Sequence, residues 1–324
     1  MTCPASMNGG DRDMNFSNPT CDLSVIATVY NDAGNIGTLA EQVVRELEAM
    51  QLDYELILVN DGSLDNSEQI ISCLCSDNPR IKGMTLSRNC GQQIAMSAGL
   101  QFAQGRFVLI MDGDLQNPPS AIPGLYRKIS EGYDIVYAVS GVRNNRFNET
   151  SSKLLWFVLN RILRLRMVPN QLMMRIMTSR FVSQFNCYGE NTRFVAGITH
   201  DIGMRYAVVE VENQRRVSGE SHYTAFKRFN LMVDIIIGVS VAPLNAMLYF
   251  GLAVCLVTLL LSAYELYVFF TQGSVPGFTS LILSMFFFNS VIIVLLGLIG
   301  KYVANIYTEV RARPLYFVKQ KFNL

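Results

Sequence analysis

Two carboxylates separated by one glycine, Asp112 and Asp114, are the clearest candidates for a chemical role in this sequence. They follow the apolar run 108–111 and precede a proline-broken turn at 115–119. An apolar strand that ends in Asp-Gly-Asp would bring two anionic oxygen ligands to the carboxyl edge of a sheet, where open α/β sheets bind their ligands. Such ligands suit Mg²⁺ or Mn²⁺, which usually bridge to substrate phosphates. A solvated Asp-Gly turn is the alternative. The elements around the motif help to distinguish a metal site from such a turn.

A repeating order of strand, polar loop and helix surrounds these carboxylates. Residue periodicity predicts strands at 23–29, 54–59, 81–86, 107–111, 133–139 and 206–211, and helices at 36–50, 67–75, 92–104, 121–131 and 194–204. Repeated units of this length predict a mostly parallel α/β sheet with helices on both faces. Polar loops follow the first four strands at 30–32, 61–63, 88–91 and 112–114. Four polar loops at one sheet edge favour a ligand site over unrelated turns.

Several function classes find no support in the sequence. There is no GxGxxG after the first strand and no GxxxxGK[ST], so neither the usual dinucleotide fingerprint nor a P-loop is indicated. The net charge of +1 gives no reason to expect a nucleic-acid partner. The 7 cysteines are odd in number and lack C-x2-C spacing, which fits a reduced, cytosolic catalytic face.

The C-terminal part of the chain is strongly apolar. Residues 235–264 and 266–300 contain no charged side chain, and each stretch has room for the roughly 20 apolar residues that span a bilayer. We expect a transmembrane hairpin with spans at 244–270 and 279–300, although a buried hairpin of a soluble protein has a similar pattern. Lys and Arg flank its outer ends, which predicts that both termini are cytoplasmic.

The same patterns predict the order of the domains. We expect a loose tail at 1–21, a cytoplasmic catalytic domain at 22–222, juxtamembrane interfacial helices at 223–243, two transmembrane helices at 244–300 and a cytoplasmic tail at 301–324. A basic amphipathic helix at 152–166 could lie on the membrane or pack on the core. Small residues in the second span, Gly297 and Gly300, are compatible with a homo-oligomer, possibly a tetramer.

Six motifs, in order, resemble those of the polyprenyl-phosphate glycosyltransferases of glycosyltransferase family 2. They are TVYND (28–32), NDGSLDNS (60–67), LSRNCGQQIAMSAGL (86–100), MDGDLQNPP (111–119), GES (219–221) and YTEVRARPLYFV (307–318). The resemblance extends from residue 22 to the C-terminus. The chain looks like the bactoprenol glucosyltransferases and the undecaprenyl-phosphate aminoarabinose transferases, and it is more distantly similar to dolichol-phosphate mannosyltransferase.

This resemblance implies a Rossmann-like GT-A fold, a UDP-sugar donor and a Mg²⁺ or Mn²⁺ ion held by Asp112 and Asp114. It implies that Asp61 accepts a hydrogen bond from the uracil and that Gln116 faces the sugar. The implied donor-binding residues are Thr28, Tyr30, Asn31, Asp61, Gly62, Arg88, Gly91, Gln92, Asp112, Gly113 and Asp114. The implied catalytic residues are Asp112, Asp114, Gln116 and Arg175.

The implied acceptor, undecaprenyl phosphate, shapes the expected mechanism. Its phosphate oxygen is already ionised at neutral pH, so the nucleophile needs no general base. Positive charge is needed instead, because two anions must approach each other, and guanidinium groups suit phosphate. The candidates for the acceptor phosphate are Arg143, Arg146, Arg175, Arg215, Arg216, Ser221 and Lys227. Two positions depart from the family pattern: Asn170 replaces an Asp, and Gly113 stands where Ala is common, an exchange that we expect to be harmless.

These features lead to one principal hypothesis and two rivals. The principal one is an inverting, metal-dependent transferase that moves a sugar from UDP to undecaprenyl phosphate on the cytoplasmic face of the bacterial inner membrane, for modification of a surface glycan such as lipopolysaccharide. A membrane-tethered nucleotide-sugar-binding protein that has lost catalysis at Asn170 is the alternative. A processive polysaccharide synthase would need more spans and a Gln-x-x-Arg-Trp motif, which the single tryptophan, Trp156, does not form.

Overall fold

The computed structural model describes residues 19–141, 171–189, 205–211, 277–311 and 313–324, together with isolated positions between 168 and 271. The chain divides into two compact units. The first comprises Met1–Leu155, Leu165–His222 and Arg313–Leu324, and the second comprises Trp156–Arg164 and Tyr223–Ala312.

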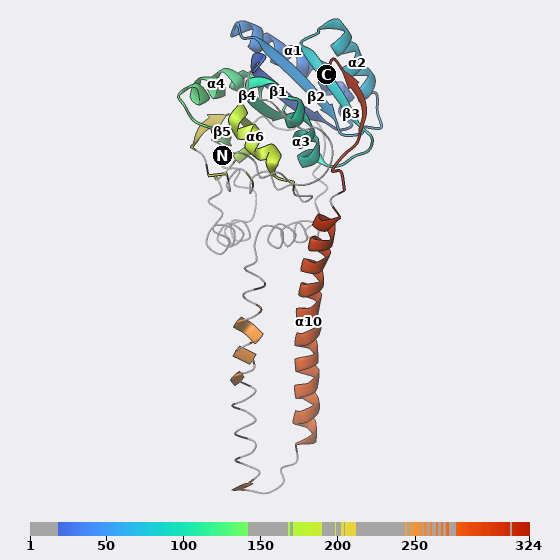
Figure 1. The fold of residues 1–324 in the computed structure, drawn as a ribbon, viewed down its shortest axis with the longest axis vertical. Coiled ribbons are helices and arrows are strands. Elements are labelled where there is room, and N and C mark those ends of the chain that lie inside the picture. Colours follow the sequence, from blue (N-terminus) through green and yellow to red (C-terminus); the bar gives the residue numbers. More distant parts are fainter. Residues whose placement is uncertain are drawn as a thin grey trace. The chain divides into compact units, whose positions relative to one another are not determined.

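An eight-stranded sheet forms the centre of the first unit (Figure 1). Its strand order is β7-β5-β6-β4-β1-β2-β3-β8. The strands are β1 Cys21–Val29, β2 Tyr54–Asn60, β3 Ile81–Leu86, β4 Gly105–Asp112, β5 Ile135–Ser140, β6 Gln171–Thr178, β7 Tyr206–Val211 and β8 Val318–Phe322. Strands β1 to β4 run parallel to one another, and β5 and β7 run in the same direction as these four strands. Strands β6 and β8 run antiparallel to their neighbours. The predicted α/β fold with a mostly parallel, GT-A-like sheet is therefore confirmed.

Helices cover both faces of this sheet, which explains why its central strands are mostly apolar. In β1, Leu23, Val25 and Ala27 contribute to one buried cluster, and Ile26 contributes to the other. The helices on the first face are α1 Ala33–Ala49, α2 Ser67–Asp77 and α4 Ile122–Ser130, which follows the short 3-10 helix η1 Pro119–Ala121. Those on the second face are α3 Gln92–Phe102 and α6 Ser179–Cys187.

The strand order reverses at the boundary between β1 and β4. From β1 the chain winds outward through β2 and β3 on one side, and β4 pairs with β1 on the other. The register sets Thr28 beside Asp112 and Val29 beside Asn60, so three strands end together at one edge. This is the position at which an open α/β sheet forms a ligand crevice.

Two strands were not predicted from the sequence. Strand β6 lies between β4 and β5, and its Arg175 pairs with Ile110 on one side and Tyr137 on the other. Strand β8 pairs with β3 at the sheet edge. Residues 313–324, which we had grouped with a C-terminal tail, thus contribute to the α/β unit, where the side-chain amide of Asn323 donates to the carbonyl oxygens of Cys75 and Ile81 at 2.6 and 2.9 Å.

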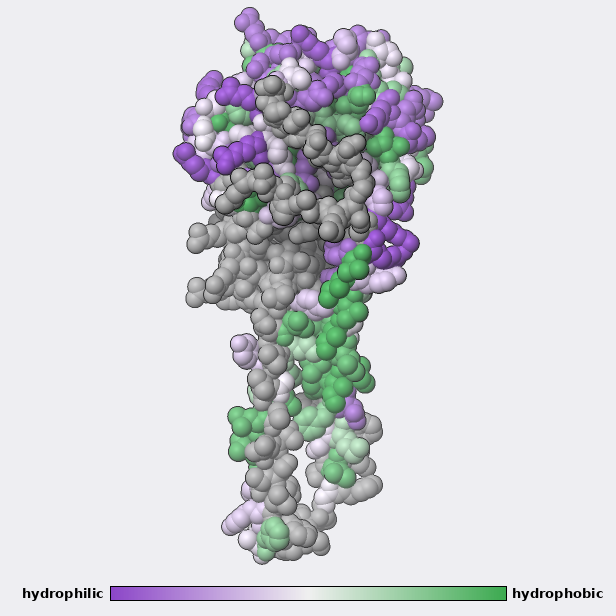
Figure 2. Space-filling view, in the orientation of Figure 1, coloured by the Kyte–Doolittle hydropathy of each residue, from purple (hydrophilic) through white to green (hydrophobic). Residues whose placement is uncertain are grey.

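The second unit contains the long helix α10, Phe278–Val310, which includes the predicted span 279–300. Within the described part of the chain, one helical segment, Val291–Val310, is long and apolar enough to cross a membrane. Its mean hydropathy is 1.8, and none of it is buried inside the protein. Hydrophobic residues gather along α10, whereas hydrophilic residues predominate on the visible surface of the α/β unit (Figure 2). The predicted span 244–270 lies largely outside the described residues, as do the helices at 152–166 and 223–243, so a two-helix hairpin is not shown.

Candidate functional site

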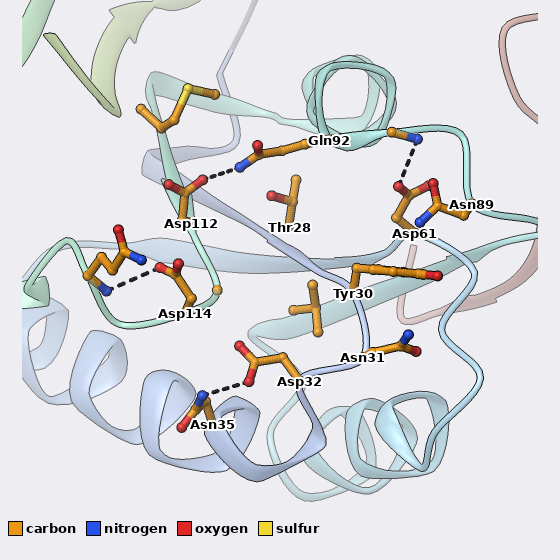
Figure 3. Close-up of a pocket in the computed structure, with 15 residues that line it drawn as sticks. Thr28, Tyr30, Asn31, Asp32, Asn35, Asp61, Asn89, Gln92, Asp112 and Asp114 are labelled. Carbon is orange, nitrogen blue, oxygen red and sulfur yellow. Dashed lines mark hydrogen bonds between the residues drawn. The ribbon is translucent and has the colours of Figure 1, made fainter. Parts of the chain in front are cut away.

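A cavity of about 760 Å³ lies at the carboxyl ends of β1, β2 and β4. Most of the residues that we expected to bind the donor line it, from four different loops. The lining comprises Thr28, Val29, Tyr30, Asn31, Asp32, Asn35, Asp61, Asn89, Gly91, Gln92, Asp112, Gly113, Asp114, Gln116 and Met173. Figure 3 shows Asp112, Asp114 and Asp32 toward one end and Tyr30, Asn31, Asp61 and Asn89 toward the other.

The Asp-Gly-Asp motif is held by amide groups from both sides. The side-chain amide of Gln92, at the start of α3, donates to Asp112 Oδ1, and Asn117 Nδ2 donates to Asp112 Oδ2 at 3.3 Å. The backbone N–H of Gln116 donates to Asp114 Oδ1 at 3.1 Å. Leu115 has a φ of 58°, a left-handed conformation that is rare outside glycine and that turns the chain back after the carboxylates. Both carboxylates are therefore oriented by their surroundings.

Gly113 is in close contact with the end of β1. Its N–H donates to the carbonyl oxygen of Thr28 at 3.0 Å, and a Cβ added at Gly113 would lie 2.7 Å from that oxygen. Because the Thr28 oxygen belongs to the backbone and cannot rotate away, an alanine at position 113 would require the turn to shift. The turn of this chain is therefore fitted to a glycine at position 113.

At the other end of the cavity, Asp61 holds the loop of residues 87–91. Its Oδ1 accepts the N–H of Cys90 at 2.8 Å, and its Oδ2 accepts the N–H of Gly91 at 2.9 Å. Asp61 is 3% exposed, and burial raises the pKa of its carboxyl above the usual value, an effect that the two backbone hydrogen bonds partly oppose. Each oxygen keeps a further lone pair, so Asp61 can accept from a ligand while it holds the loop.

The side chain of Asn31 organises the neighbouring loop. Its Oδ1 accepts the N–H of Leu64 at 2.8 Å, and its own N–H donates to Ser63 Oγ at 2.9 Å. Asn31 has a φ of 50°, a conformation that asparagine tolerates better than most residues. Asn31 therefore shapes the cavity wall as well as lining it.

Asp32 lines the cavity but was absent from the predicted site. Asn35 Nδ2 donates to Asp32 Oδ1 at 2.6 Å. Burial raises the pKa of Asp32, and the nearby carboxylates of Asp114 and Asp65 raise it further, against the effect of the Asn35 hydrogen bond. Its place in the polar loop after the first strand was the signal that could have identified it. Val29, Asn35, Asn89 and Met173 were also missed, and Met173 had no such signal because it belongs to β6.

Arg175 does not line the cavity, in contrast to the catalytic role that we expected for it. It is 2% exposed, and its Nε donates to the carbonyl oxygen of Met173 at 3.1 Å, while Nη2 lies 3.8 Å from Met173 Sδ. Nη1 has no hydrogen-bond partner in the described structure. Burial lowers the pKa of this guanidinium, and the charges of Tyr137 and Asp112 act in the opposite direction. Arg175 thus supports Met173, which does line the cavity, from behind the wall.

Gly62 and Arg88 also lie outside the lining. Arg88 is exposed, and its backbone packs against Gly62. The remaining predicted residues fall outside the described part of the chain: Arg143, Arg146, Asn170, Arg215, Arg216, Ser221 and Lys227.

The described lining is strongly acidic. Asp32, Asp61, Asp112 and Asp114 line the cavity, whereas no Lys or Arg is among the described lining residues. Within the same described residues, no group of three or more His, Cys, Asp or Glu side chains could hold a metal ion by itself. Such a site suits a cation that takes one or two carboxylates and completes its coordination with water and substrate phosphate, as Mg²⁺ does.

Comparisons with known proteins agree with this architecture. Residues 24–187 match the family described as "Glycosyl transferase family 2". The chain is 36% identical over 312 residues to "Uncharacterized glycosyltransferase sll0501" from Synechocystis sp., covering 94% of this chain and 97% of that protein. It is 31% identical over 304 residues to "Uncharacterized glycosyltransferase YkcC" from Bacillus subtilis, covering 93% and 94%.

Among solved structures, glucosyl-3-phosphoglycerate synthase from Mycobacterium tuberculosis, crystallised with Mn²⁺, UDP and phosphoglyceric acid, shares the fold. It has a TM-score of 0.50 and 15% identity, with 73% of this chain and 85% of that one covered. With the sheet order, the acidic cavity and these relatives together, the chain belongs to glycosyl transferase family 2.

Proposed function

We propose that this protein is an inverting, metal-dependent glycosyltransferase that moves a sugar from a UDP-sugar to undecaprenyl phosphate at the cytoplasmic face of a membrane. The observation that carries the proposal is the cavity itself: two oriented carboxylates lie at one end, and a loop clamped by Asp61 lies at the other. Its volume of about 760 Å³ is in the range of about 300–1,000 Å³ that is typical of small-molecule sites.

The charge of the cavity supports an anionic donor that binds together with a cation. A nucleoside diphosphate would meet several carboxylates and no described cationic lining residue, so the protein alone would repel it. Asp112 and Asp114 would hold Mg²⁺ or Mn²⁺ beside the diphosphate. When bound, this ion would neutralise charge that develops on the departing UDP. The mycobacterial protein of similar fold was crystallised with Mn²⁺ and UDP, which is consistent with this proposal.

The protein's own groups would position the donor and leave the nucleophile to the acceptor. Gln92 and Asn117 orient Asp112, and the Gln116 backbone orients Asp114. Gln116 lines the cavity, and its side chain would face the sugar. The acceptor phosphate oxygen would attack the anomeric carbon as the bond to UDP breaks, which inverts that carbon. Because this oxygen is already ionised, no side chain has to remove a proton.

Helix α10 supports a lipid-linked acceptor. Its window Val291–Val310 is apolar and unburied, as expected for a segment in a bilayer. We propose that a second span at 244–270 completes a hairpin and that Arg143, Arg146, Arg215, Ser221 and Lys227 hold the acceptor phosphate. Oligomers, including tetramers, would form through the membrane helices.

One assay tests the proposal directly. Purified full-length protein in detergent is incubated with undecaprenyl phosphate, Mn²⁺ or Mg²⁺ and, separately, UDP-glucose, UDP-galactose, UDP-N-acetylhexosamines and UDP-aminoarabinose. We expect one donor to give a lipid-linked sugar, and chelation by EDTA to abolish the product. Binding of UDP without turnover would favour a tethered binding protein, and failure to bind any UDP compound would contradict the proposal.

A further inference from the structure

Residues 316–318 lie beside the loop that forms one end of the cavity. The carbonyl oxygen of Phe317 accepts the N–H of Ser87 at 2.9 Å, and Val318 lies opposite Leu86 in the β3–β8 pairing. The register of this pairing shifts between Thr85 and Leu86, where β3 ends and the loop of residues 87–91 begins. The C-terminal segment therefore supplies backbone pairing at the start of that loop.

The same loop is held from its other side by residues that follow β2. Asp61 accepts the N–H groups of Cys90 and Gly91, and Gly62 packs so closely that an added Cβ would lie 2.7 Å from the backbone nitrogen of Asn89. The loop is thus enclosed between two separate parts of the chain. Two of its residues, Asn89 and Gly91, line the cavity.

A third contact connects the C-terminal segment to helix α3. The hydroxyl of Tyr316 donates to Gln101 Oε1 at 2.6 Å. Helix α3 begins with Gln92, whose amide orients Asp112 at the opposite end of the cavity. Tyr316 and Val318 also pack against the same hydrophobic cluster as Cys90. The segment therefore contacts both the loop of residues 87–91 and helix α3, and each of these elements supplies residues that line the cavity.

We propose that residues 316–318 are a positioning element of the donor site, which holds the loop of residues 87–91 against Asp61 and fixes α3 before the nucleotide binds. The inference rests on the proposed function, because it assigns a role in donor binding. None of the three residues lines the cavity, so they act through the loop and the helix. When only part of the population has the competent arrangement, the apparent affinity falls by that fraction.

The Tyr316 hydroxyl offers the sharpest test, because one atom can be removed without changing the ring. A neutral hydrogen bond contributes about 0.5–1.5 kcal/mol, which corresponds to a change of roughly 2- to 12-fold in an equilibrium. Tyr54→Phe is the matched control, since the Tyr54 hydroxyl also donates within the domain, to Glu48 Oε1 at 3.4 Å, but from the opposite end of β2.

Two measurements on the full-length protein follow: the dissociation constant of UDP with Mn²⁺, and hydrogen exchange of the Cys90 and Gly91 amides without ligand. For Tyr316→Phe we expect UDP to bind about 2- to 12-fold more weakly and both amides to exchange faster by a similar factor. Tyr54→Phe should leave both readouts at the wild-type value. If Tyr316→Phe lowers only the urea midpoint and leaves both readouts unchanged, the segment is merely structural and the inference is overturned.

The partner residue provides a second route to the same contact. Gln101→Leu removes the acceptor and should reproduce the effects of Tyr316→Phe, and the double variant should be no worse than either single one. Gln101→Glu keeps an acceptor and should remain near wild type. Additive effects would contradict a shared contact. If the wild-type protein does not bind UDP, the proposed function fails, and the exchange of the two amides still decides whether the segment holds the loop.

Discussion

The carboxylate of Asp61 holds two backbone N–H groups, so its removal should affect the fold as well as ligand binding. In Asp61→Ala, the partly buried N–H groups of Cys90 and Gly91 lose their acceptors, at a cost of about 1–3 kcal/mol for each unsatisfied group. We expect the free energy of unfolding to fall by about 2 kcal/mol or more. Urea denaturation measures this change, and Asp77→Ala, at an exposed position, is the control. Equal stabilities of the two variants would argue against the clamp.

The raised pKa of Asp61 also predicts a pH dependence. Because its folded-state pKa lies above the ordinary value of 3.8, the folded protein binds this proton more strongly than the unfolded chain does. The contribution of Asp61 to stability therefore falls as the pH rises from 3.8 through the raised value. Relative to Asp61→Asn, the wild type should gain stability as the pH is lowered through this window. Urea titrations of both proteins across the window measure the difference, and a constant difference would refute this assignment.

Asp114 should be decisive for sugar transfer and unimportant for the fold. Its carboxylate lines the cavity and would hold the metal ion beside the diphosphate. Removing one group that stabilises developing charge commonly lowers the rate by about 100-fold or more. We expect at least this loss for Asp114→Asn in the lipid-linked sugar assay, and Asp77→Asn should retain the wild-type rate. An unchanged rate in Asp114→Asn would remove the argument for a metal at this motif.

At the scale of elements, the contact between the loops after β2 and β3 depends on Gly62. This residue has a φ of 65°, and an added Cβ would meet the backbone of Asn89 at 2.7 Å. Gly62→Ala should therefore lower the free energy of unfolding by at least about 1–2 kcal/mol, the cost of left-handed backbone alone. Gly37→Ala, in α1 with no atom within 4 Å of the added Cβ, should raise it by about 0.5–1 kcal/mol. Thermal unfolding of both variants measures the contrast, and a stable Gly62→Ala would show that the loops can separate without cost.

The elements that follow local patterns could be predicted from the sequence, and those that depend on distant pairing could not. The first four strands are mostly apolar, because most of their residues are buried. β8 reads VKQKF, with only its end residues partly buried, so nothing local distinguishes it from a polar tail. β6 pairs antiparallel between β4 and β5, and its buried Arg175 resembles a site residue more than a strand residue.

The residues of the candidate site also fall into those that local patterns predict and those that depend on distant contacts. Residues in loops after parallel strands, such as Tyr30, Gly91 and Asp114, could be expected together because these strands end at one edge. Arg88 was expected among them, but its neighbour Asn89 lines the cavity instead, because the clamp on Cys90 and Gly91 sets which loop residue faces inward. Which side chain of a loop turns toward a ligand depends on such tertiary hydrogen bonds.

For the whole molecule, α10 predicts a membrane-bound protein. Ile293 lies near the middle of α10, Phe278–Val310, and is 70% exposed. A lysine at the centre of a spanning helix costs about 2.5–3.5 kcal/mol in insertion. We expect Ile293→Lys to lower the fraction of protein that resists alkaline extraction from membranes, whereas Ile293→Leu should not change it. Full extraction of the wild type would contradict insertion of α10.

The return of the chain to the sheet after α10 also orders events during synthesis. β8 follows α10 in the sequence, so a ribosome must complete the apolar helix before β3 can acquire its edge partner. Until then, the nascent domain exposes the free edge of β3, the kind of edge on which other chains can pair. The sheet would thus be completed, and the cavity at its edge would mature, only on proteins whose apolar helix has already been made.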